Sequence, residues 1–362
     1  MLPIIARART LGLSLALATA GLGVVATVPA SADPAATTWD VAVGAGNEFD
    51  TGLNRFYPSD ITIHRGDTVS FGWGGFHTVT FNPPPTRSVL DYLGPGGCSP
   101  GPLDAPTKFV SGVPFAPVDG VCPPPPSGPP PNGPPPNFNL LIDVPAGTYH
   151  FQCMIHQFMH GSITVKSGAL PRTNADNKAL AAAQIAADNN RATALDARLT
   201  GRVSHTSGEA LVGAGDRIVE FAKFYPSSIT VHVGDELTFT DLDLHEPHTV
   251  SFGPIAGDPR DPTFGVFPSG PGDPRAYDGT SALNSGYLFY RSMYDYWNLK
   301  VSAVSSAVPR TRFSLTFTTP TAAGKPVNFY CAIHGQLLPD GSVVGMSGNI
   351  TVLPAQNGGD NG

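Results

Sequence analysis

The sequence has few charged residues, little helical periodicity and, beyond its first 32 residues, no long apolar run. Only 14% of its 362 residues are charged, and the net charge is −7. An acidic surface gains nothing by releasing the counterions of nucleic acid or anionic lipid, so neither is expected as a partner. No segment after residue 32 is long and apolar enough to span a bilayer, so we expect no membrane span. The 41 Gly and 38 Pro favour turns over helices.

Residues 1–32 have the features of a removable secretory signal. Arg7 and Arg9 precede an apolar stretch at 11–28, and Ala30-Ser31-Ala32 supplies a small-residue cleavage site. We therefore expect an exported, soluble protein that is extracellular, at the cell surface or periplasmic.

The rest of the chain contains an internal repeat. Residues 56–67 match residues 224–235 without a gap, and the length differences between later matched segments fall between them. Loops vary in this way over a shared scaffold. The repeat predicts a first domain at 33–167, a helical linker at 168–204, a second domain at 205–354 and a flexible tail at 355–362.

Both copies alternate apolar and polar residues with a period of two. The apolar positions are Ile61, Ile63, Val69 and Phe71 in the first copy and Ile229, Val231, Leu237 and Phe239 in the second. Short alternating strands between Gly-rich turns predict an all-β protein made of two antiparallel β-sandwiches.

Three segments interrupt this pattern. The Ala-rich stretch at 174–199 predicts a helix, capped by Asn174 or Asp176. Residues 123–136 are rich in Pro and Gly and predict an extended loop. An aromatic-rich insert at 254–310 is expected to pack onto the sandwich rather than to form a docking patch.

Only four cysteines are present. Cys98 and Cys122 flank a Gly- and Pro-rich stretch and have no nearby His, so we expect them to form a disulfide in an oxidising compartment. Cys153 and Cys331 then remain, one in each copy.

Each remaining cysteine belongs to a repeated pattern of metal-ligating residues. A His lies far upstream, a second His follows the Cys by three positions, and a Met comes later. The two sets are His77, Cys153, His156 and Met159 in the first copy and His248, Cys331, His334 and Met346 in the second. Two imidazoles, a thiolate and a weak thioether are the ligands of a blue copper centre. The upstream His and the Cys share strand parity with apolar residues, so both should point inward.

Two alternatives compete with copper binding. The histidines could be ordinary core or surface residues beside inert thiols, but the set recurs in register in both copies. Zinc could bind the same residue types, but the Met and the sandwich context favour copper.

Both halves resemble cupredoxins of the plastocyanin and amicyanin type, over about 38–166 and 208–353. Cys153-x-x-His156-x-x-Met159-x-Gly161 is similar to the amicyanin ligand loop. The resemblance implies Greek-key sandwiches, one copper ion per domain and the two ligand sets above. The second copy departs from it by the long segment between His334 and Met346, which we expect to be a loop with more freedom.

Thr78 and Thr249 follow the first His of each set, where these relatives often carry Asn. We therefore expect hydrogen bonds around the metal ligands that differ from those of the relatives.

The other histidines favour a carrier over an enzyme. Laccases and copper nitrite reductases add copper sites through His-x-His pairs or a His beside the copper Cys. Here the neighbours of the cysteines are Gln152, Met154, Tyr330 and Ala332, and no His-x-His occurs. His160 and His245 are expected at the surface. We predict an electron-transfer protein that exchanges electrons with a redox protein. Copper storage, copper delivery or a structural copper site is the alternative, and a multicopper oxidase or nitrite reductase ranks third.

Overall fold

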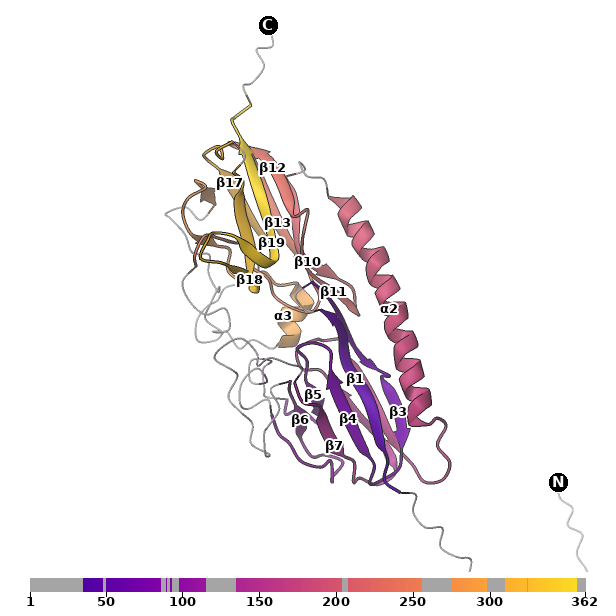
Figure 1. The fold of residues 1–362 in the computed structure, drawn as a ribbon. Helices are drawn as coiled ribbons and strands as arrows, with labels where there is room; N and C mark the ends of the chain where they lie inside the picture. Colours follow the sequence, from indigo (N-terminus) through magenta and orange to yellow (C-terminus); the bar gives the residue numbers. More distant parts are fainter. Residues whose placement is uncertain are drawn as a thin grey trace, which may run out of the picture. The chain divides into compact units, whose positions relative to one another are not determined.

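The computed structural model describes most of the chain between residues 35 and 356 (Figure 1). The described residues from 36 onward belong to one compact unit. The predicted signal at 1–32, Cys122 and large parts of the two inserts lie outside the described residues, which are 35–47, 50–85, 89, 92, 98–114, 135–203, 208–255, 275–297, 310–323 and 325–356.

The described part of the first half is built from strands. They are β1 (Thr38–Asn47), β2 (Thr51–Tyr57), β3 (Asp60–Ile63), β4 (Thr68–Trp73), β5 (Val79–Phe81), β6 (Val110–Gly112), β7 (Phe138–Leu141), β8 (Gly147–Gln152) and β9 (His160–Val165).

A long helix, α2 (Asn174–Arg202), leads into the second half, which repeats the strand pattern and adds a short helix. Its elements are β10 (Glu209–Gly215), β11 (Val219–Tyr225), β12 (Ser228–His232), β13 (Glu236–Leu242), β14 (Ser251–Phe252), β15 (Ala276–Tyr277), β16 (Leu283–Asn284), α3 (Arg291–Trp297), β17 (Arg312–Phe317), β18 (Val327–Leu337) and β19 (Val343–Leu353).

Within the described residues, the strands form three sheets. One nine-stranded sheet runs β15-β17-β13-β10-β11-β2-β1-β4-β7 and contains strands of both halves. Two five-stranded sheets, β3-β9-β8-β5-β6 and β12-β19-β18-β14-β16, each belong to one half. The protein is mostly β, so the predicted all-β class is confirmed. The sheets are mixed and not purely antiparallel as predicted, because β1 pairs with β4 and β3 with β9 in parallel, as do β10 with β13 and β12 with β19 in the second half.

The two halves join along β2 and β11, which are equivalent strands of the repeat. They pair antiparallel, with Leu53 opposite Val219 and Gly52 opposite Glu220. Pairing covers the edges that both strands would otherwise expose. The halves therefore share a continuous sheet instead of being connected only by the linker.

Each half has its own core, made by the alternation seen in the sequence. In the first core Phe56 and Phe151 meet edge to face with ring centroids 4.7 Å apart. In the second, Phe224 and Phe329 do the same at 4.7 Å. Aromatic pairs prefer this geometry, which orients strands that carry metal-ligating residues.

Helix α2 lies alongside β1, β2 and β11 (Figure 1). Its N-cap is Thr173, not Asn174 or Asp176 as predicted. Asp176 instead completes the capping box by accepting a hydrogen bond from the Thr173 backbone N–H. The helix fastens to both halves, because Tyr57 donates to Asp188 at 2.9 Å and Tyr225 donates to Asp196 at 2.5 Å.

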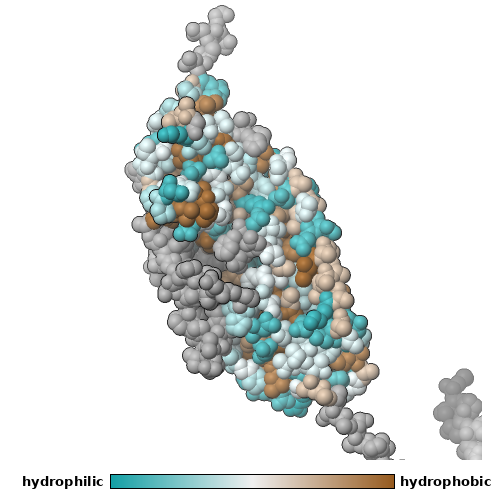
Figure 2. Space-filling model, viewed as in Figure 1, coloured by the Kyte–Doolittle hydropathy of each residue, from teal (hydrophilic) through white to brown (hydrophobic). Residues whose placement is uncertain are grey.

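The described surface carries few large exposed apolar side chains. They are Leu141, Tyr290, Val344 and Leu353. On the face drawn in Figure 2, apolar residues form small separate groups among polar ones. Within the described residues, no helix has the length and apolar character needed to cross a membrane.

Candidate metal centres

The first group of predicted ligands comes together at one end of the first sandwich. His77 lies between β4 and β5, Cys153 directly follows β8, and His156 lies in the loop after it. Their ligand atoms all lie within 4.8 Å of one another. His156 Nδ1 is 2.8 Å from His77 Nδ1 and 3.4 Å from Cys153 Sγ.

Met159 belongs to the same buried core as Cys153 and is 1% exposed. The loop that carries it is closed by a hydrogen bond from the Cys153 backbone N–H to the Met159 carbonyl at 2.9 Å. This compact turn holds the Cys, the second His and the Met of the first set on one short segment. That Met159 binds copper stays a prediction.

The second group has the same arrangement. The ligand atoms of His248, Cys331 and His334 also lie within 4.8 Å of one another. Cys331 Sγ is 3.8 Å from His248 Nδ1 and 3.6 Å from His334 Nδ1. Among the described residues, these two triplets are the groups of three or more His, Cys, Asp or Glu with ligand atoms this close.

The segment between His334 and Met346 is ordered, contrary to the loop expected from its length. β18 and β19 continue into it as a hairpin, with Gly335 opposite Gly345 and Leu337 opposite Val343. Ladder hydrogen bonds fix a backbone that a long loop would leave free. Met346 is 2% exposed and belongs to the core that contains Cys331.

Both cysteines are poised to be thiolates. Burial alone would raise the pKa of Cys153, but the charge and hydrogen bond of His156 outweigh it and bring the pKa well below its ordinary value. Cys331 behaves in the same way through hydrogen bonds with His248 and His334, so its pKa is also well below the ordinary value. The thiolate is the form that binds metal, and these donor sets fit copper.

The threonines after the first His make the same contacts in both halves. Thr78 N–H donates to Cys153 Sγ at 3.3 Å, and Thr249 N–H donates to Cys331 Sγ at 3.4 Å. The hydroxyl of each threonine accepts the backbone N–H of the residue after the Cys at 2.8 Å. The threonine therefore links the two strands that carry the first His and the Cys.

The first His of each set differs in its outer contact. His248 donates from Nε2 to Asp243 Oδ2 at 2.9 Å, and both side chains are fully buried. A carboxylate of this kind fixes the orientation of a metal-binding imidazole. Both rings also lie against glycine backbone: an added Cβ would lie 2.0 Å from His77 Nε2 at Gly44 and 2.1 Å from His248 Nε2 at Gly213.

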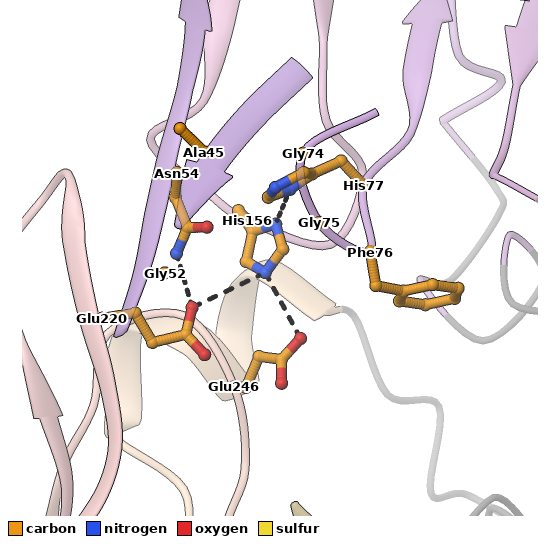
Figure 3. A pocket seen from close by; sticks show the side chains of 10 residues that line it. All are labelled: Ala45, Gly52, Asn54, Gly74, Gly75, Phe76, His77, His156, Glu220 and Glu246. Atoms are coloured by element: carbon orange, nitrogen blue, oxygen red, sulfur yellow. Dashed lines mark hydrogen bonds and ion pairs between the residues drawn. The ribbon is translucent and has the colours of Figure 1, made fainter. Parts of the chain in front are cut away.

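The second His of each set contacts one shared carboxylate. Glu246 lies 3.3 Å from His156 Nε2 through Oε1 and 2.5 Å from His334 Nε2 through Oε2. Figure 3 shows His156 with Glu246 on one side and His77 on the other. Burial would raise the pKa of Glu246, but hydrogen bonds from His156 and His334 hold it well below the ordinary value.

Glu220 is a buried acid that lines a small cavity together with His156 and Glu246. Glu220 Oε2 lies 3.8 Å from His156 Nε2 and accepts from Asn54 at 2.5 Å (Figure 3). Burial and the charges of Asp243 and Glu246 raise the pKa of Glu220 to about 8. The free volume beside these groups is about 10 Å³, which is close to the space that one water needs.

His245 was predicted at the surface, and this prediction is wrong. It is fully buried, and its Nε2 lies 2.7 Å from the Asp216 carbonyl. The ring also lies 5.7 Å from the His156 ring, so the first half helps to cover it. Burial lowers the pKa of His245 to about 4. His160 is exposed, as expected.

Part of the aromatic insert of the second half packs against the first core. Phe289 and Met293 are buried there, and Tyr296 donates to the Cys153 carbonyl at 2.8 Å. Gln157 donates to the Leu244 carbonyl at 2.7 Å from the ligand loop. The insert was expected to pack onto a sandwich, and its described part covers the first metal-ligand group.

The predicted disulfide concerns a residue outside the described part. Cys98 is described and Cys122 is not. The bond between them stays a prediction, while Cys153 and Cys331 are buried free thiols.

No family model matches the chain, and no curated protein matches it. Solved cupredoxin structures do resemble it. Plastocyanin from the fern Dryopteris crassirhizoma is 26% identical, with 35% of this chain and 99% of that chain covered and a TM-score of 0.19. A mutant amicyanin in its Cu(I) form is 15% identical, with 36% and 82% covered and a TM-score of 0.19.

A pseudoazurin from Hyphomicrobium denitrificans is 14% identical, with 36% of this chain and 76% of that chain covered and a TM-score of 0.18. The predicted resemblance to cupredoxins is thus matched by the structures found, each over about a third of the chain. Because these TM-scores are low, the functional proposal rests on the topology and ligand groups of the chain itself.

Proposed function

We propose that the protein is an exported electron-transfer protein with one mononuclear blue copper site in each half. The supporting observation is the pair of buried His/Cys/His groups, each with a buried Met in the same core. The first site would be held by His77, Cys153, His156 and Met159 and the second by His248, Cys331, His334 and Met346. Bound copper would supply reversible one-electron chemistry.

The protein's own residues prepare each site for a metal that changes its charge. The thiolates stay ionised because imidazoles surround them, and each receives a hydrogen bond from a threonine N–H. Burial excludes water, and the sheets fix the strands that carry the ligands. Small rearrangement between oxidation states favours fast electron transfer.

The same features argue against catalysis at these sites. With four ligands each, neither copper has an open position for a substrate. Further His ligands of the kind that build additional copper sites are missing from the sequence. The partner is proposed to be a redox protein that exchanges single electrons.

Voltammetry of the copper-loaded protein, combined with stopped-flow mixing with small redox proteins, tests this proposal. We expect reversible one-electron cycling at both sites. Ready loss of copper to a chelator with poor cycling would instead favour storage or delivery. Steady turnover of a phenol or of nitrite would show an enzyme.

A further inference from the structure

The second His of each ligand set turns one nitrogen inward and the other toward the same side chain. Nδ1 of His156 and Nδ1 of His334 face the Cys of their own group, at 3.4 Å and 3.6 Å. Their Nε2 atoms both contact Glu246, one through each carboxylate oxygen. One carboxylate therefore spans two groups that belong to different halves of the chain.

The chemistry of the imidazole gives these contacts a direction. A neutral imidazole that binds metal through Nδ1 carries its proton on Nε2, so each Nε2 donates to Glu246. His156 is 2% exposed and His334 is 5% exposed, so neither ring has an open edge for an outside partner. The remaining edge of each ring faces Glu246, a residue of the second half, so only the His156 contact crosses between the halves.

We propose that Glu246 is a positioning residue that couples the two centres into one redox unit, in which an electron passes between them inside the molecule. This inference rests on the proposed copper sites. In each transfer one site is oxidised by one electron and the other is reduced by one, so no further reactant is needed. The connection consists of two imidazole rings and one carboxylate, with a hydrogen bond at each end of the carboxylate.

The surrounding structure holds this connection in place. The halves are joined by the pairing of β2 with β11 and by the hydrogen bond from Gln157 to the Leu244 carbonyl, two residues before Glu246. The matched segment of the first half has Gly75 where the second half has Glu246, counting back from the first His of each set. A single side chain from one half therefore supplies the whole bridge.

Substitution of Glu246 tests the proposal. In the copper-loaded wild-type protein, a pulse of reductant should deliver less than one electron per molecule. Freeze-quenched EPR and absorption then follow its redistribution between the centres. The two centres should be distinguishable because the first histidine of the second set, His248, donates to Asp243, whereas the matching position in the first half is Gly72. We expect a first-order rate that is independent of protein concentration.

In Glu246→Ala the redistribution should slow by about tenfold or more, the effect expected when a partner of a metal-bound histidine is lost. Glu246→Gln serves if the Ala variant does not fold, since its amide can accept from only one of the two N–H groups. Glu220→Gln is the matched control, because that acid contacts His156 but has no hydrogen bond to His334.

EPR spectra of the copper-loaded variants, recorded without adding reductant, give a readout that does not depend on electron transfer. Glu246→Ala should shift the copper spectra of both sites, whereas Glu220→Gln should shift only that of the first. An unchanged rate in Glu246→Ala with both coppers retained would overturn the coupling and leave the proposed function standing. A wild-type protein without two blue coppers would overturn the proposed function itself, and the coupling with it.

Discussion

The two metal-ligand groups share their scaffold and differ in the segment that leads to their first histidine. In the first half this segment is Trp73-Gly74-Gly75-Phe76, which supplies two aromatic side chains that pack against the core and no carboxylate. In the second half, residues 241–247 supply Asp243 to His248 and Glu246 to both halves. A repeated sandwich thus keeps the ligands constant while a loop of one copy adds the polar contacts that make the sites unequal.

The scaffold that the two halves share makes pairs of equivalent contacts. The threonine N–H bonds to the sulfurs, at 3.3 Å and 3.4 Å, are nearly the same in both halves. The aromatic pairs beneath them have the same centroid separation of 4.7 Å. These contacts explain why both groups form despite their different loops.

The largest effects are expected from two glycines that lie against the first histidine of each set. Gly44 and Gly213 have positive φ values of 74° and 68°, and a Cβ would lie 2.0 Å from His77 Nε2 or 2.1 Å from His248 Nε2. Gly44→Ala and Gly213→Ala should each abolish copper binding in their own half and cost about 2–4 kcal/mol of unfolding free energy. Copper analysis and urea unfolding measure both effects.

Gly66→Ala separates the ring contact from backbone strain. Gly66 also has a positive φ, 89°, but no atom lies within 4 Å of an added Cβ. We expect it to lower stability by about 1 kcal/mol without loss of copper. Equal copper loss in Gly66→Ala and Gly44→Ala would show that strain, not the histidine, matters.

The comparison is sharpest at Asp243, which has no counterpart in the first half. Asp243→Ala removes the acceptor of His248 Nε2–H. We expect copper affinity at the second site to fall by about 10–100-fold while the first site keeps its affinity. Competition titration with a chelator, read by the absorption of each site, measures this difference. A parallel loss at both sites would mean that Asp243 acts on the whole fold.

The methionines test whether the hairpin of the second half is as well ordered as the loop of the first. Met159 and Met346 are 1% and 2% exposed. The hairpin removes the reason to expect a weaker role for Met346, so Met159→Leu and Met346→Leu should shift the visible spectra by similar amounts. A shift confined to Met159→Leu would show that Met346 is a core residue and not a copper ligand.

The smallest effects concern the helix that bridges the halves. Tyr57→Phe and Tyr225→Phe each remove one hydrogen bond to α2 and should cost about 1 kcal/mol of unfolding free energy. Tyr57→Phe should cost more, because the Asp188 side chain is 9% exposed whereas the Asp196 side chain is 39% exposed. Urea unfolding measures both, and copper absorption should not change. A larger loss in Tyr225→Phe would contradict this order.

The sequence alone predicted the sandwich fold and the residues that the two groups bring together. Period-two patterning identifies strands, and a ligand set that recurs in register is hard to produce by chance. The loop before Met346 was misjudged because length says nothing about whether two strands simply extend as a hairpin.

The contacts between the halves could not be predicted in this way. Nothing in the local pattern of β2 or β11 indicates that the two edges pair with each other. Without that pairing, His245 resembles a surface residue and Glu246 an ordinary loop acid. Their contacts with His156 form where the second half covers the first.

Copper counting in cysteine variants tests the central claim most directly. The wild-type protein, Cys153→Ser, Cys331→Ser and the double variant should be loaded with copper and measured by metal analysis, visible absorption and EPR. We predict two, one, one and no blue copper centres, since the thiolate is the source of the colour. A wild-type protein that stays colourless, or a double variant that is still blue, would contradict the two-centre account.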